Sequence, residues 1–350
     1  MLNVTDQVLT KGNSSLRSKG TYRPNNSRDK FSLDNFTTPS FSYKKALSLA
    51  EASKLAYENE SIIKTTAETG WGFSNCDFIT VGSTQLFVAQ TENIILVAFR
   101  GTQSNLEDWL GNMDIRTVSK TYGNVHKGFE AHYANIKQQL ETILSNSNAA
   151  NKSIWLTGHS LGGAIATIAA AELMSSYAIS GIYTFGQPRV GFEGLRTFME
   201  TNYADNFFRF VNQDDPITLL PWKGARDWQD VGNLIHMSGT TAISPSIQKS
   251  SKVAGGAPSL SPTEFQNLLK TITKFKQELK AKRSSFTRPK LRDKPVDYKW
   301  PMDNTNKFKK IKETKMKTLS QMKGQYLSVD DHSLDNYIAA LHKLSLMQVS

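Results

Sequence analysis

The chain has 350 residues, 39% of them hydrophobic and 21% charged, which is long enough for one large domain with a sizeable core. Its single cysteine, Cys76, excludes an internal disulfide and any thiolate-rich metal site. The formal charge of +11 is concentrated in residues 241–325, which hold 20 Lys and Arg but 6 Asp and Glu, so the basic character belongs to one segment.

The beginning of the chain is polar. Residues 1–38 contain few large apolar side chains, so we expect a flexible leader there and one folded domain over 39–350. No secretory signal and no run long enough for a transmembrane helix is visible. We therefore expect a soluble or peripheral protein that is either cytoplasmic or exported by a route without a cleaved signal.

The first half of the domain shows clear periodicities. Apolar positions recur at helical spacing from Tyr43 to Tyr57 and again from Val125 to Leu144, and each predicts a packed helix. Between them, Gln85–Gln90 and Ile94–Phe99 predict a hairpin. The second of these runs is apolar on both faces, as in the central strand of a covered sheet.

Strands and helices then alternate. We predict strands at Ser153–Thr157, Ile182–Phe185 and Phe207–Val211, an alanine-rich helix at Leu161–Met174, and a last helix carrying the apolar stripe of residues 334–341. This alternation is typical of an α/β fold with a mostly parallel central sheet and helices on both faces.

Residues 241–325 interrupt this pattern. A Ser/Gly/Pro-rich loop is followed by a helix start at Ser261 and Pro262, with Glu264 three residues after the cap. The helix has an apolar face from Phe265 to Leu279 and is surrounded by lysines. We expect a basic, partly helical insertion in the domain.

The sequence Gly158-His-Ser160-Leu-Gly162 fits the pattern G-x-S-x-G. In this pattern a sharp turn between a strand and a helix lifts the serine oxygen clear of the sheet, and the glycines let the backbones pass closely. The N-terminus of the following helix offers N–H groups to a developing oxyanion. With a predicted strand before it and a helix after it, Ser160 is a candidate nucleophile.

A serine needs a neutral imidazole and an orienting carboxylate to attack at neutral pH. With a G-x-S-x-G nucleophile the chain order is Ser, acid, His, which leaves His236, His332 and His342 as candidate bases. Asp214 and Asp215 directly follow a predicted strand and are candidate acids.

Seven blocks in order resemble the class 3 lipases, the fungal-lipase-like family of α/β-hydrolases. They are VAFRGT (97–102), DW (108–109), VHKGF (125–129), TGHSLGGA (157–164), TFGQPRVG (184–191), RFVNQDDPITLLP (209–221) and DDHSLDNYIAAL (330–341). The resemblance covers about residues 41–240 and 328–345. It implies the α/β-hydrolase fold and a serine ester hydrolase of the lipase or phospholipase A type, which acts on acyl lipids through an acyl-enzyme and needs no cofactor.

The resemblance also implies residue roles. Ser160 matches the nucleophile, Asp215 the acid and His332 the base, while Thr102 and Leu161 match the oxyanion hole. His236 resembles a second family position and is the alternative base. The basic insertion separates acid and base by more than a hundred residues, a longer spacing than the family usually has, but loop closure costs grow slowly with length.

Two segments concern access to lipid. Apolar residues at i, i+3, i+4 and i+7 predict a short amphipathic helix: Leu106, Trp109, Leu110 and Met113. This helix is either a mobile lid, as the family carries at this place, or an ordinary packed surface helix. The cationic stretch 262–323 suits peripheral contact with an anionic membrane, or docking on the domain with its lysines in water. No nucleic-acid motif and no metal-binding signature is present.

Two other functions remain open. An acyltransferase or thioesterase would use the same three residues with a different acceptor or acyl donor. A catalytically inactive lipid- or membrane-binding protein could retain the scaffold, although the intact Ser, Asp and His positions argue against this.

Overall fold

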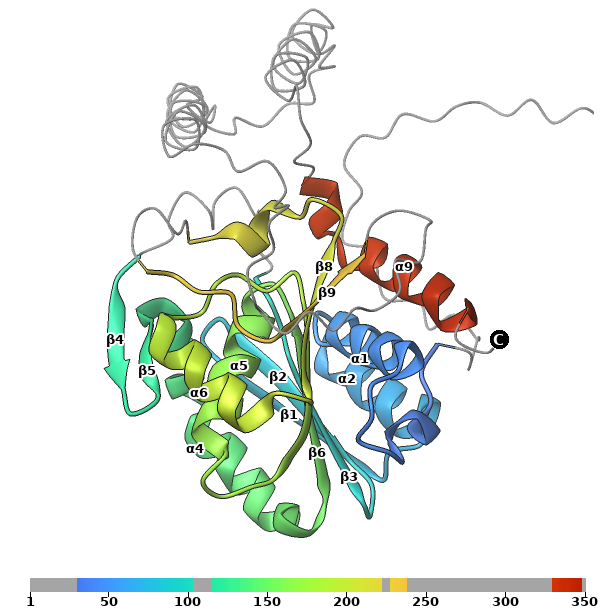
Figure 1. The fold of residues 1–350 in the computed structure, drawn as a ribbon. Helices are drawn as coiled ribbons and strands as arrows, with labels where there is room; N and C mark the ends of the chain where they lie inside the picture. Colours follow the sequence, from blue (N-terminus) through green and yellow to red (C-terminus); the bar gives the residue numbers. More distant parts are fainter. Residues whose placement is uncertain (1–29, 103–114, 222–226, 238–328, 348–350) are drawn as a thin grey trace, which may run out of the picture.

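A seven-stranded sheet lies at the centre of the computed structural model, which describes residues 30–102, 115–221, 227–237 and 329–347 (Figure 1). Its strands, in sheet order, are β1 (Asn75–Val81), β2 (Thr84–Gln90), β3 (Ile94–Phe99), β6 (Ser153–His159), β7 (Ile179–Phe185), β8 (Phe207–Asn212) and β9 (Asn233–Met237). The pairs β1–β2 and β2–β3 are antiparallel, and the remaining four pairs are parallel. The predicted mostly parallel sheet is confirmed.

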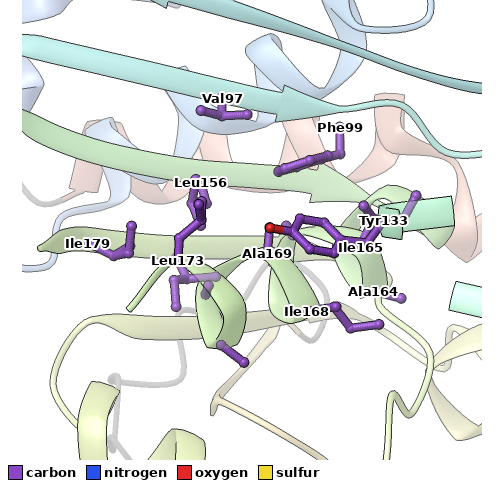
Figure 2. Packing of buried hydrophobic residues seen from close by; sticks show 14 of the residues in the cluster. Val97, Phe99, Tyr133, Leu156, Ala164, Ile165, Ile168, Ala169, Leu173 and Ile179 are labelled. Atoms are coloured by element: carbon purple, nitrogen blue, oxygen red, sulfur yellow. The ribbon is translucent and has the colours of Figure 1, made fainter. Parts of the chain in front are cut away.

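Helices cover both faces of this sheet (Figure 1). One face carries α4 (Lys127–Asn146), α5 (Leu161–Leu173) and α6 (Glu193–Tyr203), and the other carries α1 (Tyr43–Leu55), α2 (Glu60–Thr65) and α9 (Leu334–Met347). Strand side chains alternate between the two resulting cores: Leu156 packs in the first and Trp155 in the second. Figure 2 shows part of the first core, where Val97 and Leu156 of the sheet lie near Ile165 and Leu173 of α5.

Short elements complete the described chain. They are the hairpin β4 (Thr117–Lys120) and β5 (Gly123–His126), the 3-10 turns η1 (Leu33–Phe36), η3 (Ala149–Asn151), η4 (Pro216–Leu219) and η5 (Val329–His332), and the π-turn η2 (Thr66–Gly70). Two of them, η4 and η5, lie against each other. The turn η4 comes shortly after β8, at the end of the sheet where the parallel strands terminate, which is where α/β folds place their reactive groups.

The boundary predicted for the flexible leader is too late. Residues 1–29 lie outside the described residues, but residues 30–38 are packed: Phe31 stacks on Trp71 with ring centroids 4.0 Å apart, and Phe36 meets Trp155 at 5.4 Å. Both phenylalanines are buried in the second core. Two aromatic anchors in a polar stretch are enough to fix it, because each buries a large apolar area.

One predicted helix begins later than its periodicity suggests. Val125 and His126 pair with β4 as part of β5, and α4 begins at Lys127. The His126 side chain ends the strand and caps the helix, since its Nδ1 accepts hydrogen bonds from the N–H groups of Gly128 and Phe129 at 3.1 and 3.3 Å.

Several predicted features lie outside the described residues: the candidate lid residues Leu106, Trp109, Leu110 and Met113, and the basic insertion 241–325. Among the residues that are described, no helix is long and apolar enough to cross a membrane.

Candidate active site

The turn between β6 and α5 places Ser160 at the end of the sheet. Ser160 has φ 58° and ψ −126°, an unusual conformation for a residue with a side chain, and it lies between the last residue of β6 and the first of α5. Its backbone N–H donates to the carbonyl of Phe185 on β7 at 2.9 Å, which ties the turn to the neighbouring strand. This is the strained strand–turn–helix that the G-x-S-x-G pattern predicts.

The two glycines of the pattern are required by close approaches of the backbone. A Cβ on Gly158 would lie 2.3 Å from the carbonyl carbon of Gly162, and a Cβ on Gly162 would lie 2.1 Å from the carbonyl oxygen of Phe99. Any side chain at either position would therefore push α5 away from β6 or β3. The glycines bring the first turn of α5 directly behind Ser160.

The Thr102 segment lies beside this turn. Phe99, the last residue of β3, pairs with Gly158, and a Cβ on Gly101 would lie 2.6 Å from the carbonyl oxygen of His159. The Thr102 hydroxyl oxygen is buried and has no hydrogen-bond partner among the described residues. A buried donor without a partner costs free energy unless a ligand accepts from it, so its position is suited to stabilising an oxyanion.

Asp215 and His332 are in direct contact although 117 residues separate them. The Nδ1 of His332 lies 2.8 Å from Oδ2 of Asp215. Asp215 is 1% exposed and His332 6% exposed. The carboxylate accepts two further hydrogen bonds, from the Tyr337 hydroxyl at 2.6 Å and from the N–H of Ile217 at 2.9 Å.

These contacts decide the ionisation of Asp215. Burial alone raises the pKa of its carboxyl group, but the charge and hydrogen bond of His332, together with the donors Tyr337 and Ile217, outweigh it, and the pKa is lowered. Asp215 is therefore a carboxylate at neutral pH. Burial, and next the charge of the same carboxylate, raises the pKa of the Tyr337 hydroxyl, so Tyr337 remains a donor.

The Asp215–His332 pair lies close to the Ser160 turn. Gly186, next to the Phe185 carbonyl that holds Ser160, has φ 60°, and a Cβ there would lie 2.8 Å from both Oδ2 of Asp215 and Nδ1 of His332. On the other side, Nε2 of His159 lies 2.8 Å from the carbonyl oxygen of His332. The His332 segment is fixed again where Nδ2 of Asn212 donates to the Asp331 carbonyl at 3.1 Å.

The other candidates lie apart from this contact. His236 is exposed on β9, and its Nε2 lies 2.7 Å from the carbonyl oxygen of Gln213. Asp214 is partly exposed beside Asp215. Within the described ranges, no three His, Cys, Asp or Glu side chains are grouped so that they could hold a metal ion.

Sequence reasoning did not single out Tyr337 or Asn212. Tyr337 was expected only as part of the apolar stripe of the last helix, yet its hydroxyl contacts the acid. A tyrosine in such a stripe is a usable signal, because a buried hydroxyl needs a partner and Tyr337 is 0% exposed.

Comparison with known families finds one family model in this region. Residues 96–224, which contain Thr102, Ser160 and Asp215, match the model described as "Lipase (class 3)". His332 lies outside the matched range.

Curated relatives carry names of the same kind. The chain is 28% identical over 233 residues to "Triacylglycerol lipase OBL1" of Arabidopsis thaliana, covering 49% of this chain and 44% of the relative. It is 34% identical over 132 residues to "Secreted mono- and diacylglycerol lipase 1" of Fusarium solani, covering 36% and 39%. It is 30% identical over 151 residues to "Phospholipase A(1) DAD1, chloroplastic" of Arabidopsis thaliana, covering 36% and 33%. These matches span less than half the length of each relative.

Solved structures of fungal lipases are similar at low identity. Lipase II from Rhizopus niveus superimposes with a TM-score of 0.49 at 20% identity, covering 56% of this chain and 81% of that one. The lipase from Rhizopus microsporus var. chinensis gives 0.47 at 21%, covering 56% and 74%.

Proposed function

We propose that this chain, whose residues 96–224 match the class 3 lipase model, is a serine ester hydrolase that acts on acyl lipids. The observation that carries the proposal is the contact of 2.8 Å between His332 and Asp215 beside the strained turn of Ser160. An imidazole held by a buried carboxylate next to a serine in a strained turn is the arrangement that activates a serine for attack on an ester.

The hydrogen bond to Asp215 sets the tautomer of His332. Because the carboxylate only accepts, Nδ1 of His332 must carry the proton, and Nε2 is then the basic nitrogen of the ring. Nε2 takes the proton of the Ser160 hydroxyl as its oxygen attacks the ester carbonyl carbon. The new C–O bond gives a tetrahedral intermediate and an imidazolium, which the charge of Asp215 stabilises.

The Thr102 segment and the start of α5 would hold the oxyanion. The Thr102 hydroxyl and N–H and the N–H of Leu161, the first residue of α5, are the proposed donors, and the partial positive charge of the helix N-terminus adds to them. The alcohol leaves with the proton from His332 and an acyl-enzyme remains on Ser160. Water, deprotonated by the same imidazole, then releases the acid and restores the serine.

The substrate class follows the family. The curated relatives are named as triacylglycerol, mono- and diacylglycerol lipases and as a phospholipase A(1), all of which cleave carboxylic esters of acyl lipids. We propose the same bond for this chain, in a triacylglycerol or a phospholipid.

We also propose that the cationic stretch 262–323 brings the enzyme to anionic membranes. It lies outside the described residues, and the proposal is supported by its sequence: an apolar helical face from Phe265 to Leu279 with lysines around it. Such a helix binds a lipid surface through its apolar face and through the attraction of its charges to anionic headgroups.

A panel of soluble and lipid esters tests the enzymatic proposal. Wild-type protein should release fatty acid from at least one ester, and Ser160→Ala should lower kcat by about 10⁴-fold or more while the thermal unfolding midpoint stays close to wild type. Turnover that survives Ser160→Ala, or wild-type protein that hydrolyses none of the esters, would refute it. With an added alcohol, acyl transfer that outpaces hydrolysis would indicate an acyltransferase.

A further inference from the structure

His159, the residue before Ser160, has hydrogen bonds on both ring nitrogens. Nδ1 lies 3.0 Å from the hydroxyl of Tyr57, and Nε2 lies 2.8 Å from the carbonyl oxygen of His332. The side chain is 7% exposed, and its ring centroid is 4.6 Å from that of His332. Both polar atoms of this buried ring are therefore satisfied, and each bond leads to a different segment of the candidate site.

Chemistry fixes the direction of these bonds. The His332 carbonyl only accepts, so Nε2 of His159 must donate to it. In the neutral ring Nδ1 is then the acceptor, and the Tyr57 hydroxyl donates to it. The Tyr57 oxygen in turn accepts from the backbone N–H of Gly101. The result is a one-way chain that runs from Gly101 through Tyr57 and His159 to His332.

The ring of His159 is suited to this part because it stays neutral. Burial, and next the charge of His332, lower its pKa to about 3. A protonated His159 would carry a hydrogen on Nδ1, which would remove the acceptor for Tyr57. Over the neutral range the chain of bonds is therefore intact.

The chain joins the three segments on which the proposed reaction depends. Gly101 precedes Thr102, the proposed oxyanion donor. His159 precedes Ser160, and the bond at the far end holds the backbone of His332 itself. The approach is close at the Gly101 end, where a Cβ would lie 2.1 Å from the Tyr57 oxygen.

We propose that His159 and Tyr57 are positioning residues, which hold the Thr102 segment, the Ser160 turn and the His332 backbone at fixed separations through this chain of hydrogen bonds. The inference rests on the proposed serine hydrolase function. Neither residue contacts the substrate; each acts on the distance between the groups that do. Misplacement by about 1 Å costs on the order of 100-fold in rate, so loss of the chain should lower kcat more than it changes KM.

Replacing His159 with an amide side chain removes one of its two hydrogen bonds and keeps the other. In His159→Gln the amide nitrogen reaches the position of Nε2 and can still donate to the His332 carbonyl. In His159→Asn the amide oxygen reaches only the position of Nδ1 and can still accept from Tyr57. His159→Leu removes both bonds, and Tyr57→Phe removes one hydroxyl and with it the link to Gly101.

Tyr203→Phe is the matched control for Tyr57→Phe. The Tyr203 hydroxyl donates to the carbonyl of Ala170 at 2.9 Å between α6 and α5, away from the candidate site. It makes the same chemical change at a buried hydrogen bond, so it reports the effect of lost stability alone.

The measurement is kcat and KM on a soluble ester together with the thermal unfolding midpoint of each variant. We expect His159→Leu and His159→Asn to lower kcat by about 10- to 100-fold with little change in KM, and His159→Gln to recover most of that loss. Tyr57→Phe should lower kcat by several-fold, while Tyr203→Phe should keep wild-type kcat at a similar loss of midpoint. If His159→Leu does not fold, the comparison of Gln with Asn and of the two tyrosines carries the test.

The inference is overturned if the Gln and Asn variants have equal kcat, or if Tyr203→Phe and Tyr57→Phe lower kcat alike. It is also overturned if every variant of an active enzyme keeps the wild-type kcat. Wild-type protein without any ester turnover is a different result, because it overturns the proposed function and the inference together.

Discussion

Asp215 concentrates more interactions than any single role in packing would need. Its carboxylate is buried at the end of β8 and accepts from His332, Tyr337 and the N–H of Ile217. Three donors around one carboxylate fix its orientation and keep it charged, which is what a group that orients an imidazole requires. The orientation and the charge of this carboxylate are therefore the most tightly constrained features of the proposed chemistry.

Exchanging this carboxylate for an amide tests the orientation. In Asp215→Asn the side chain keeps its shape, but the amide can offer an N–H to His332 and reverse its tautomer, so that Nε2 is no longer the basic nitrogen. We expect kcat on a soluble ester to fall by about 10³- to 10⁴-fold with KM nearly unchanged. Asp214→Asn is the control, and it should leave kcat within a few-fold of wild type. Equal losses for the two variants would contradict the assignment of Asp215.

At the scale of elements, the elbow depends on how closely α5 approaches β3 and β6. Gly162 and Gly163 are neighbours in α5 and differ in this respect: a Cβ on Gly162 would lie 2.1 Å from the Phe99 carbonyl oxygen, whereas on Gly163 its nearest contact would be 3.1 Å away. Gly162→Ala should therefore lower the free energy of unfolding by about 3 kcal/mol or more.

Gly163→Ala is the matched comparison. The mild crowding of a Cβ at this position, with its nearest contact at 3.1 Å, is offset by the higher helix propensity of alanine, which is worth about 1 kcal/mol relative to glycine. The net change in the free energy of unfolding should therefore be small. Chemical denaturation of both variants measures the difference. A Gly162→Ala protein as stable as Gly163→Ala would mean that the approach of α5 is not as close as described.

A second feature at this scale is a partly buried ionic cluster that attaches the β4–β5 hairpin. Glu172 on α5 lies 2.9 Å from the ammonium of Lys120 on β4 and 2.6 Å from that of Lys137 on α4. Burial raises the pKa of Glu172, but the hydrogen bonds from Lys120, Lys137 and Tyr122 outweigh it and lower the pKa to about 2.

The sign of the resulting pH dependence follows from linkage. Because the folded pKa lies below the unfolded one, Glu172 stabilises the fold above about pH 4.3, and this contribution is lost as the pH falls towards 2. Glu172→Gln should lower the unfolding midpoint at pH 6 and reduce the difference between pH 6 and pH 3. An unchanged difference would show that other carboxylates account for the acid sensitivity.

The elements that the sequence predicts are those with strong local patterns. Ile94–Phe99 and the Ser153–Thr157 strand, with the helix after Ser160, are found as β3, β6 and α5. The strands β1, β4, β5 and β9 were not predicted. The strand β9, for example, has a weak sequence signal because it is short, lies at the sheet edge and is only partly buried. A signal for α6 was present in Leu195, Met199 and Tyr203, which recur every four residues and are buried.

The site was predictable in part. The pattern around Ser160 is local, and its strained turn was expected from the glycines. The contact of Asp215 with His332 joins residues 117 apart, and from the residues alone three histidines remained open; only the family resemblance favoured His332. The bonds of His159 to Tyr57 and His332 span 102 and 173 residues, and no local pattern signals them.

At the scale of the whole molecule, the net positive charge lies in a different part of the sequence from the proposed catalytic residues. Residues 241–325 have a net charge of +14, and the rest of the chain has −3. Each lysine near an anionic surface contributes about 1 kcal/mol to membrane binding. Replacing three lysines of the cationic stretch with glutamine should therefore weaken binding to phosphatidylserine-containing vesicles on the order of 100-fold; the three are Lys270, Lys274 and Lys276.

Three exposed lysines of the described surface give the control: Lys44, Lys127 and Lys343. Their replacement with glutamine changes the net charge by the same amount and should affect vesicle binding much less. Cosedimentation with vesicles measures binding, and kcat on a soluble ester should stay at the wild-type value in both triple variants. Equal weakening by the two triple variants would show that total charge, and not the cationic stretch, governs binding.

In the proposed mechanism His332, held by Asp215, activates Ser160. A fluorophosphonate, which reacts covalently with activated serines, tests it when the adduct is located by peptide mass mapping. We expect an adduct on Ser160 in the wild type and in His236→Ala, and reaction slower by about 10³-fold or more in His332→Ala. An adduct on another residue, or reaction lost in His236→Ala and kept in His332→Ala, would contradict it.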